Sequence, residues 1–395
     1  MKTVASNFES APMAVNAPAR ETRRLLFIDN IRIFLTMLVI AHHLMVIYAD
    51  SGGWIYHEGR QDDITSALGG WFCQVNQSYF MGLFLFISAY FVPGAYDRKG
   101  SGKFLIDRLV RLGIPLATYS WALRPLLIFL GMRSSLQSSF WKWYTGEYFR
   151  DYGLIGGGPL WFIEALLLFS LAYVIWRLLK RSRSGHPITT SQFPTNGTIA
   201  IFAFLLGVTS FLVRLVFPVN DTFVPLNLQF ANFSQYIALF ILGLIAYQRN
   251  WLTTLPDSAG KLWLGIAVLL VLLYGPLALL GGATQDVEPF FGGWHWQSLV
   301  FALWDAFLCI SMCIGLIFLF QRRLNHQGAI AHELSRSAYT TYLIHEPVIS
   351  FLAIFIAGVM IYPLLKFLIT CVVFIPICFG LGGLVRRLPY FDRVL

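Results

Sequence analysis

Apolar residues gather in long runs, separated by short polar stretches, along almost the whole chain. A helix that crosses the hydrocarbon core of a bilayer needs about 20 consecutive, mostly apolar residues. Ten runs fit this requirement, so the pattern predicts an all-α, polytopic membrane helical bundle of about ten transmembrane helices. We expect the spans at residues 31–50, 79–96, 109–131, 160–177, 199–217, 231–248, 261–281, 296–320, 338–359 and 363–385.

The composition supports an integral membrane protein. Hydrophobic residues make up 57% of the 395 residues and charged residues only 12%, about half the usual share of a soluble domain. A soluble fold of this length could not cover so many apolar side chains with polar surface. The five cysteines form no C-x-x-C pair, so we expect neither a disulfide framework nor a metal site.

The basic residues indicate how the chain is oriented in the membrane. The net charge is +9, and Lys and Arg concentrate in the cytoplasmic segments of membrane proteins. In a ten-helix arrangement most basic residues fall on one side, together with both chain ends. We therefore interpret the charge as a topology signal and not as a sign of nucleic-acid binding.

This interpretation predicts a multi-pass protein of the cell (inner or plasma) membrane with both termini in the cytoplasm. The expected parts are a cytoplasmic tail at 1–24, a transmembrane domain at 25–387 and a second cytoplasmic tail at 388–395. On the other side, two long segments at 51–78 and 132–159 are rich in aromatic residues. Such rings form interfacial belts, or they offer flat faces on which sugar rings stack, and the sequence leaves both interpretations open.

The first span carries an arginine and two histidines that are costly in a membrane and therefore candidate functional residues. Arg32 and His43 are eleven residues apart, about three helical turns, so they share one face about 16 Å apart along the axis. His42 lies about 100° away on another face. Arg32 also fits a topology anchor, and a deep histidine also fits an interhelical hydrogen bond.

Further charged residues fall near the ends of other spans. Arg108 and Arg111 are three residues apart at the start of the third span, with Lys103 just upstream, so their guanidinium groups can converge. Converging guanidinium groups suit phosphate, but a basic cluster at this position also suits anionic lipid headgroups.

Glu164 and Arg124 are expected in the outer half of the membrane, where they form either an ion pair or part of a polar catalytic chamber. His345 lies in the inner half of the ninth span, two residues before Pro347. The proline favours a kink in the helix. The kinked segment either lines a path for a ligand or only adapts the helix to its neighbour.

Four stretches share their order and placement with a known family. They are Phe27-Ile28-Asp29-Asn30-Ile31-Arg32 leading to His43, Phe104-Leu105-Ile106-Asp107-Arg108-Leu109-Val110-Arg111-Leu112, Pro159-Leu160-Trp161-Phe162, and Tyr339-Thr340-Thr341-Tyr342-Leu343-Ile344-His345-Glu346-Pro347. On these residues the chain resembles the acyltransferase-3 family of membrane O-acyltransferases, and most of all the branch that contains the glucan-modifying succinyltransferases. The resemblance covers residues 24–385.

The resemblance implies an enzyme that moves an acetyl- or succinyl-type group from cytoplasmic acyl-CoA to a hydroxyl of a glycan or another acceptor. It implies that Arg32 and His43 match the family's essential arginine–histidine pair in the first helix, and that Arg108 and Arg111 match its paired arginines. A positioned histidine can take the proton of a hydroxyl as it attacks a thioester, so His43 is the expected general base.

The remaining site assignments follow from the same mechanism. His42 is the alternative base, and Glu164 is the candidate that orients the other ring nitrogen of the base. Lys103 and His345 are expected to join the arginines in contacting acyl-CoA. Acyl-CoA is expected as a co-substrate, with no permanently bound cofactor.

Other interpretations stay open at the level of sequence. An acyl-enzyme route needs a nucleophile, for which Ser88 and the histidines are the candidates. Ten spans with charged residues also fit a transporter or exporter of a small polar or acylated solute. A lipid-binding structural membrane protein is a third interpretation.

Overall fold

The computed structural model describes residues 24–49, 52–58, 62–131, 138–155, 158–180, 191–224 and 226–389. Within these ranges the chain is helical, apart from turns, connecting segments and one isolated bridge between Phe223 and Leu228. The tail expected at 1–24 is described only at Arg24, and the tail expected at 388–395 only at Leu388 and Pro389. The rest of both tails lies outside the described residues.

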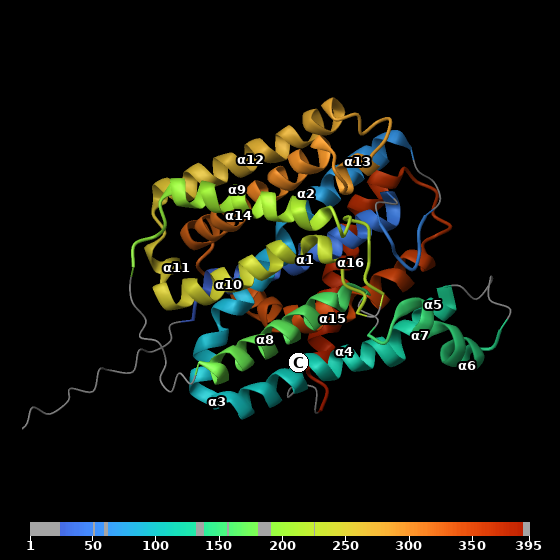
Figure 1. Ribbon diagram of the computed structural model, residues 1–395. Coiled ribbons are helices and arrows are strands. Elements are labelled where there is room, and N and C mark those ends of the chain that lie inside the picture. Colours follow the sequence, from blue (N-terminus) through green and yellow to red (C-terminus); the bar gives the residue numbers. More distant parts are fainter. Residues whose placement is uncertain are drawn as a thin grey trace, which may run out of the picture.

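Ten long helical stretches correspond to the ten predicted spans (Figure 1). They are α1 (Leu26–Ala49), α2 (Asp63–Tyr90), the stretch Val92–Gly131, α8 (Trp161–Leu179), α9 (Asn196–Arg214), α10 (Phe233–Arg249), α12 (Asp257–Leu280), α14 (Trp296–Arg323), α15 (Ala329–Phe355) and α16 (Pro363–Arg386). Among the described residues, eight stretches are long and apolar enough to cross a membrane. Helices α2 and α15 have the length but carry more polar side chains. The predicted all-α membrane bundle is therefore confirmed.

The position predicted for the second span is wrong. Helix α2 begins at Asp63 and ends at Tyr90, so the predicted span 79–96 crosses the break at Phe91, and much of the predicted outer loop is helical. The first turns of α2 are too polar to be recognised as part of a transmembrane span from hydropathy. Their start is fixed by Asp62, whose carboxylate accepts hydrogen bonds from the backbone N–H groups of Ile64 and Thr65 at 3.1 and 3.0 Å. A hydrogen bond from the Thr65 hydroxyl, together with these backbone bonds, lowers the pKa of Asp62.

The second predicted outer loop is also partly helical. Its described part contains α6 (Phe140–Trp143), a π-helical turn η3 (Tyr144–Tyr148) and α7 (Phe149–Tyr152), which lie with α5 (Arg124–Gly131) at one end of the bundle (Figure 1). Trp143 and Tyr148 are buried against Ile128 and form a small separate core. Many aromatic residues of this segment therefore pack on one another.

The stretch Val92–Gly131 combines α3 (Val92–Arg108), η1 (Leu109–Gly113), α4 (Ile114–Thr118), η2 (Tyr119–Leu123) and α5. The π-helical turns η1 and η2 each precede a proline by a short distance. A proline has no N–H to donate to the carbonyl four residues earlier, so the carbonyls of Arg111 and Trp121 lose their usual partners. Tyrosine hydroxyls from other segments replace them: Tyr339 donates to Arg111, and Tyr144 donates to Trp121 at 2.9 Å.

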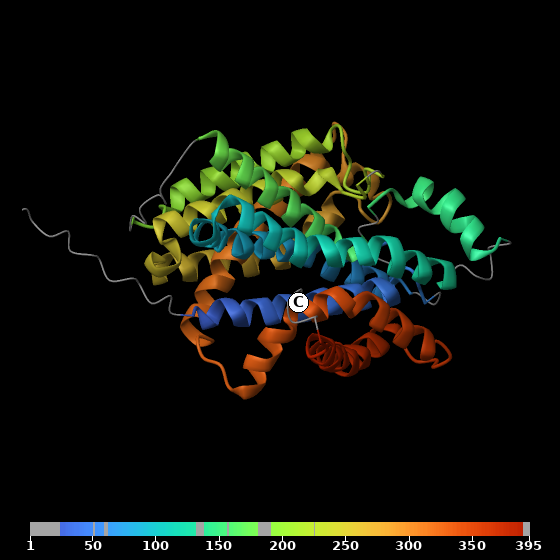
Figure 2. The same ribbon diagram turned by 90° about the horizontal axis from the view of Figure 1, so that it is seen from below.

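Helix α1 is packed on both sides. Ile31, Leu35 and Val39 belong to the large core that most other helices build, whereas Ile40 and Leu44 belong to a second core shared with α15 and α16. Figure 2 shows α1 between α16 and the larger group of helices. Burial on opposite faces fixes the rotation of α1, and with it the direction of each polar side chain that α1 carries.

Candidate active site

His43 on α1 and His345 on α15 meet inside the bundle, although 302 residues separate them in the chain. His43 Nδ1 lies 3.0 Å from His345 Nε2, and the two ring planes are nearly parallel, inclined by 15°, with centroids 5.1 Å apart. Trp54, in the segment that follows α1, stacks on His43 at 4.4 Å. The predicted base is therefore held between an aromatic ring and a second imidazole.

The hydrogen bonds of His345 determine which nitrogen of His43 carries the proton. His345 Nδ1 lies 2.5 Å from the carbonyl oxygen of Tyr342, and a carbonyl only accepts, so His345 Nδ1 is the protonated donor. In the neutral ring, His345 Nε2 is then an acceptor, and His43 Nδ1–H must donate to it. His43 therefore keeps its lone pair on Nε2, which is the state that a general base requires.

A second polar contact lies next to His345. The buried carboxylate of Glu346 accepts a hydrogen bond from the hydroxyl of Tyr119, which stands on the π-helical turn η2. The hydroxyl of Tyr342 donates to the carbonyl of Pro159 at the entrance of α8. These bonds tie α15 to its neighbours on both sides of His345 and hold the histidine pair in register.

His42 faces a different environment. Its ring packs against Phe80 of α2 with centroids 5.1 Å apart, and its buried Nδ1 has no hydrogen-bond partner among the described residues. His42 therefore has no hydrogen bond at Nδ1 in the described structure, whereas His43 has one to His345.

Two expectations for Glu164 are wrong. His345, not Glu164, occupies the Nδ1 side of His43, because α15 packs against α1 and brings its imidazole there. The buried carboxylate oxygens of Glu164 have no hydrogen-bond partner in the described part of the chain, so the ion pair with Arg124 is absent. The guanidinium of Arg124 lies over the ring of Tyr152 instead.

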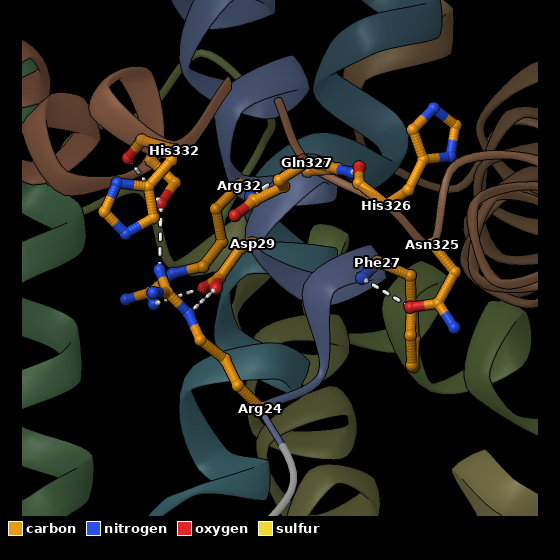
Figure 3. A network of polar contacts seen from close by, with 10 residues as sticks. Arg24, Phe27, Asp29, Arg32, Asn325, His326, Gln327 and His332 are labelled. Carbon is orange, nitrogen blue, oxygen red and sulfur yellow. Dashed lines mark hydrogen bonds and ion pairs between the residues drawn. The ribbon is translucent and has the colours of Figure 1, made fainter. Parts of the chain in front are cut away.

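The N-terminal end of α1 carries a separate polar network. Arg24, Asp29 and Arg32 point toward one another (Figure 3), with Arg24 Nε 2.6 Å from one Asp29 oxygen and Arg32 Nη1 3.9 Å from the other. Asn30 Nδ2 donates to the carbonyls of Leu324 and His326 at 2.6 and 2.9 Å. This network fixes the start of α1 against the connection between α14 and α15, and leaves the side chain of Arg32 49% exposed.

The paired arginines lie near this end as well. The charge of Arg108 interacts with those of Arg111 and Arg32, and the charge of Arg32 interacts with that of Arg111. The three arginines predicted for this site therefore lie near one another, although they come from two helical stretches. Such a group of guanidinium groups suits the binding of an anion. Lys103 is exposed on the same helical stretch.

His345 was expected among the acyl-CoA contacts, but the structure places it beside the base. Arg32 and His43 are about 16 Å apart along α1, so His345, which contacts His43, lies well away from the arginine cluster. Sequence reasoning missed Trp54 as a neighbour of His43 and Tyr119 as the partner of Glu346. No local pattern marks them, because both reach the site only through tertiary packing.

Two buried arginines elsewhere in the bundle are paired with aspartates. Arg214 of α9 and Asp305 of α14 form an ion pair at 2.6 Å, with Arg214 Nη2 also 3.3 Å from Asn232. Arg177 of α8 pairs with Asp97 at 2.8 Å. These pairs join neighbouring helices and do not contact the histidine pair in the described structure.

Comparisons with known proteins identify the family of the chain. Residues 25–383 match a family described as an acyltransferase domain. Curated relatives named glucans biosynthesis protein C, from Salmonella typhimurium (strain LT2) and Salmonella typhi, are 24% identical over 384 residues, which is 92% of this chain and 92% of each relative. No solved structure matches the chain. The match covers almost every described helix, and the chain therefore belongs to the acyltransferase-3 family of multi-pass membrane acyltransferases.

Proposed function

We propose that the protein is an O-acyltransferase of the cell membrane that moves an acetyl- or succinyl-type group from cytoplasmic acyl-CoA to a hydroxyl of a glycan. The observation that carries the proposal is the histidine pair, in which His345 holds His43 with its lone pair on Nε2. The family supports acyl transfer, and the name of the relatives concerns the biosynthesis of glucans.

In the proposed reaction, His43 Nε2 removes the proton of the acceptor hydroxyl while its oxygen attacks the thioester carbonyl. The new C–O bond forms as the C–S bond breaks, and the proton on His43 passes to the departing CoA thiolate. The bond from His43 Nδ1–H to His345 holds the ring in one tautomer throughout, and the Tyr342 carbonyl supports His345 in turn.

The donor would lie along α1. Arg108 and Arg111 would bind the CoA phosphates with Arg32, because guanidinium groups make strong charge-assisted hydrogen bonds to phosphate oxygens. The pantetheine arm then has to cover about 16 Å, the axial distance from Arg32 to His43. In this arrangement the CoA phosphates would lie at the cytoplasmic face and the thioester inside the membrane. Both chain ends would then be cytoplasmic.

The test is an acyl-transfer assay in membranes that contain the His43→Ala variant, with radiolabelled acetyl-CoA and succinyl-CoA and isolated surface glycans. We expect a loss of about 10²- to 10⁴-fold in turnover, the usual contribution of a general base. His42→Ala is the matched comparison, since it changes the neighbouring imidazole that faces Phe80. Full activity in His43→Ala would remove the proposed base, and a selective loss in His42→Ala would transfer the role to His42.

A further inference from the structure

Residues 52–58 follow α1 and bring Trp54 against His43, and we call this segment the Trp54 cover. The indole of Trp54 stacks on the imidazole of His43 with centroids 4.4 Å apart and planes inclined by 27°. Trp54 is only partly buried, so part of the residue remains accessible to solvent. The cover approaches His43 from the end of α1 opposite to the arginines.

Several hydrogen bonds hold the cover in place. Trp54 Nε1 donates to the hydroxyl of Ser350, five residues beyond His345 on α15, at 3.1 Å. The Trp54 backbone N–H donates to His57 Nε2 at 3.0 Å, which closes a tight turn. The Glu58 backbone N–H donates to the carbonyl of Ile47 on α1 at 3.1 Å. The cover is thus attached to both helices that carry the histidine pair.

An ion pair attaches the cover to a third helix. Both carboxylate oxygens of Glu58 lie 2.7 Å from Lys366 Nζ of α16, which also donates to the carbonyl of Val359 at 3.0 Å. The Lys366 side chain is only 1% exposed. A buried ammonium without its counter-charge is strongly unfavourable, so Lys366 favours the position of the cover in which Glu58 is beside it.

The start of the cover is built from Gly52 and Gly53, both exposed. Gly52 has φ +150°, a backbone conformation that other residues rarely adopt. Two glycines in front of a tryptophan allow the backbone to change direction at little steric cost. The Trp54 cover is therefore attached firmly at its C-terminal residue, Glu58, and has a conformationally permissive backbone at its N-terminal glycines.

We propose that the Trp54 cover is the acceptor subsite, in which Trp54 receives the sugar ring of the acceptor and the Glu58–Lys366 ion pair holds Trp54 beside His43. The proposal rests on the proposed function and adds to it the residues that position the acceptor. An indole combines a broad apolar face with one N–H donor, so it suits a pyranose ring, whose C–H groups form an apolar face rimmed by hydroxyls. With Nε1 engaged by Ser350, the ring plane is fixed before the acceptor arrives.

Steady-state kinetics test the role of Trp54. In Trp54→Ala we expect the KM for the glycan acceptor to rise about three- to tenfold, the effect of losing one aromatic stacking partner. The KM for acyl-CoA should stay within about twofold, because the phosphate site is on the other end of α1. Trp54→Phe should recover part of the effect. An unchanged acceptor KM in Trp54→Ala would overturn the subsite.

Trp294→Ala is the matched control, because Trp294 is also an accessible tryptophan but packs against Phe211 of α9, with the ring planes inclined by 51°. It should leave both KM values unchanged. An equal rise of the acceptor KM in this control would show a general effect of losing surface aromatics, and would also overturn the proposal.

A second experiment tests the attachment without any acyl transfer. In a His43→Cys variant, the rate of maleimide labelling at residue 43, read by peptide mass spectrometry, reports how often the cover opens. Adding Glu58→Gln should raise that rate on the order of tenfold, because Lys366 loses its counter-charge and the closed position loses its preference. Adding Asp151→Asn, which breaks the exposed Arg150–Asp151 pair, should not.

Charge exchange separates opening from unfolding. Glu58→Lys and Lys366→Glu alone should speed labelling, and the double exchange should restore the slow rate, because the pair re-forms with its charges reversed. Equal labelling in Glu58→Gln and its parent would refute the attachment. Because labelling requires no donor or acceptor, slow labelling that depends on Glu58 would stand even if acyl transfer itself were disproved.

Discussion

Replacing His345 with alanine removes the acceptor of the His43 Nδ1–H bond, and it is the most direct perturbation of the histidine pair. The 3.0 Å contact fixes both the ring plane and the tautomer of His43. Without it, the proton of His43 is free to sit on either nitrogen, and only one of the two tautomers presents a lone pair to the acceptor hydroxyl. The expected effect therefore appears in kcat and not in the binding of acyl-CoA.

The magnitude follows from the environment of the bond. His345 is fully buried and His43 is partly buried, so water does not readily replace the acceptor that His43 Nδ1 loses. Leaving a buried donor without a partner costs about 1–3 kcal/mol. Carried into the transition state, this cost corresponds to a fall in kcat of about 5- to 150-fold. The loss should be smaller than in His43→Ala, in which the base itself is gone.

The assay is saturating acyl transfer by His345→Ala, His43→Ala and the double variant. If His345 acts only through His43, the double variant should be no slower than His43→Ala, since coupled residues are not additive. His345→Gln is the conservative comparison, because its amide oxygen can still accept from His43 Nδ1–H. The His345→Gln variant should retain most of the activity that the His345→Ala variant loses.

Two outcomes would refute this reasoning. A double variant that is slower than His43→Ala by the full factor of the His345 single variant would show that His345 acts independently of His43. Parent activity in His345→Ala would show that the hydrogen bond does not orient the base. In either case the tautomer argument fails while the family membership stands.

Three further predictions address the donor site, the stability and the orientation. Arg111→Ala should raise the KM for acyl-CoA about tenfold or more with little change in kcat, because it removes a charged phosphate contact; an unchanged KM would remove Arg111 from the donor site. Asp305→Ala should destabilise the protein by about 3–5 kcal/mol, because it leaves the buried Arg214 without its counter-charge, and thermal melting in detergent would show it. Replacing both residues with leucine should recover most of that loss, and a melt unchanged in Asp305→Ala would contradict the argument. Single cysteines at 98–108 should be labelled by an impermeant reagent from the cytoplasmic side alone, and labelling from the outside of intact cells would reverse the proposed topology.

The long apolar runs were enough to predict the fold class. A bilayer requires about 20 apolar residues for each spanning helix, and all ten predicted spans have a helical counterpart. The eleven-residue spacing of Arg32 and His43 places them on one face of α1 whatever the neighbours are. The start of α2 at Asp63 escaped prediction because its first turns are polar, and the break at Phe91 is not visible in a hydropathy pattern.

Tertiary structure alone decided what surrounds His43. His345 and Trp54 come from segments whose contact with α1 depends on which helices pack together, and local periodicity carries no information about that choice. The same packing moved the orienting role from Glu164 to His345 and turned His42 toward Phe80. Sequence determined that helices form and which residues share one helix face, because these follow from short-range geometry and the cost of polar groups in lipid. The arrangement of the site depends on side-chain packing between distant segments, which only the folded chain defines.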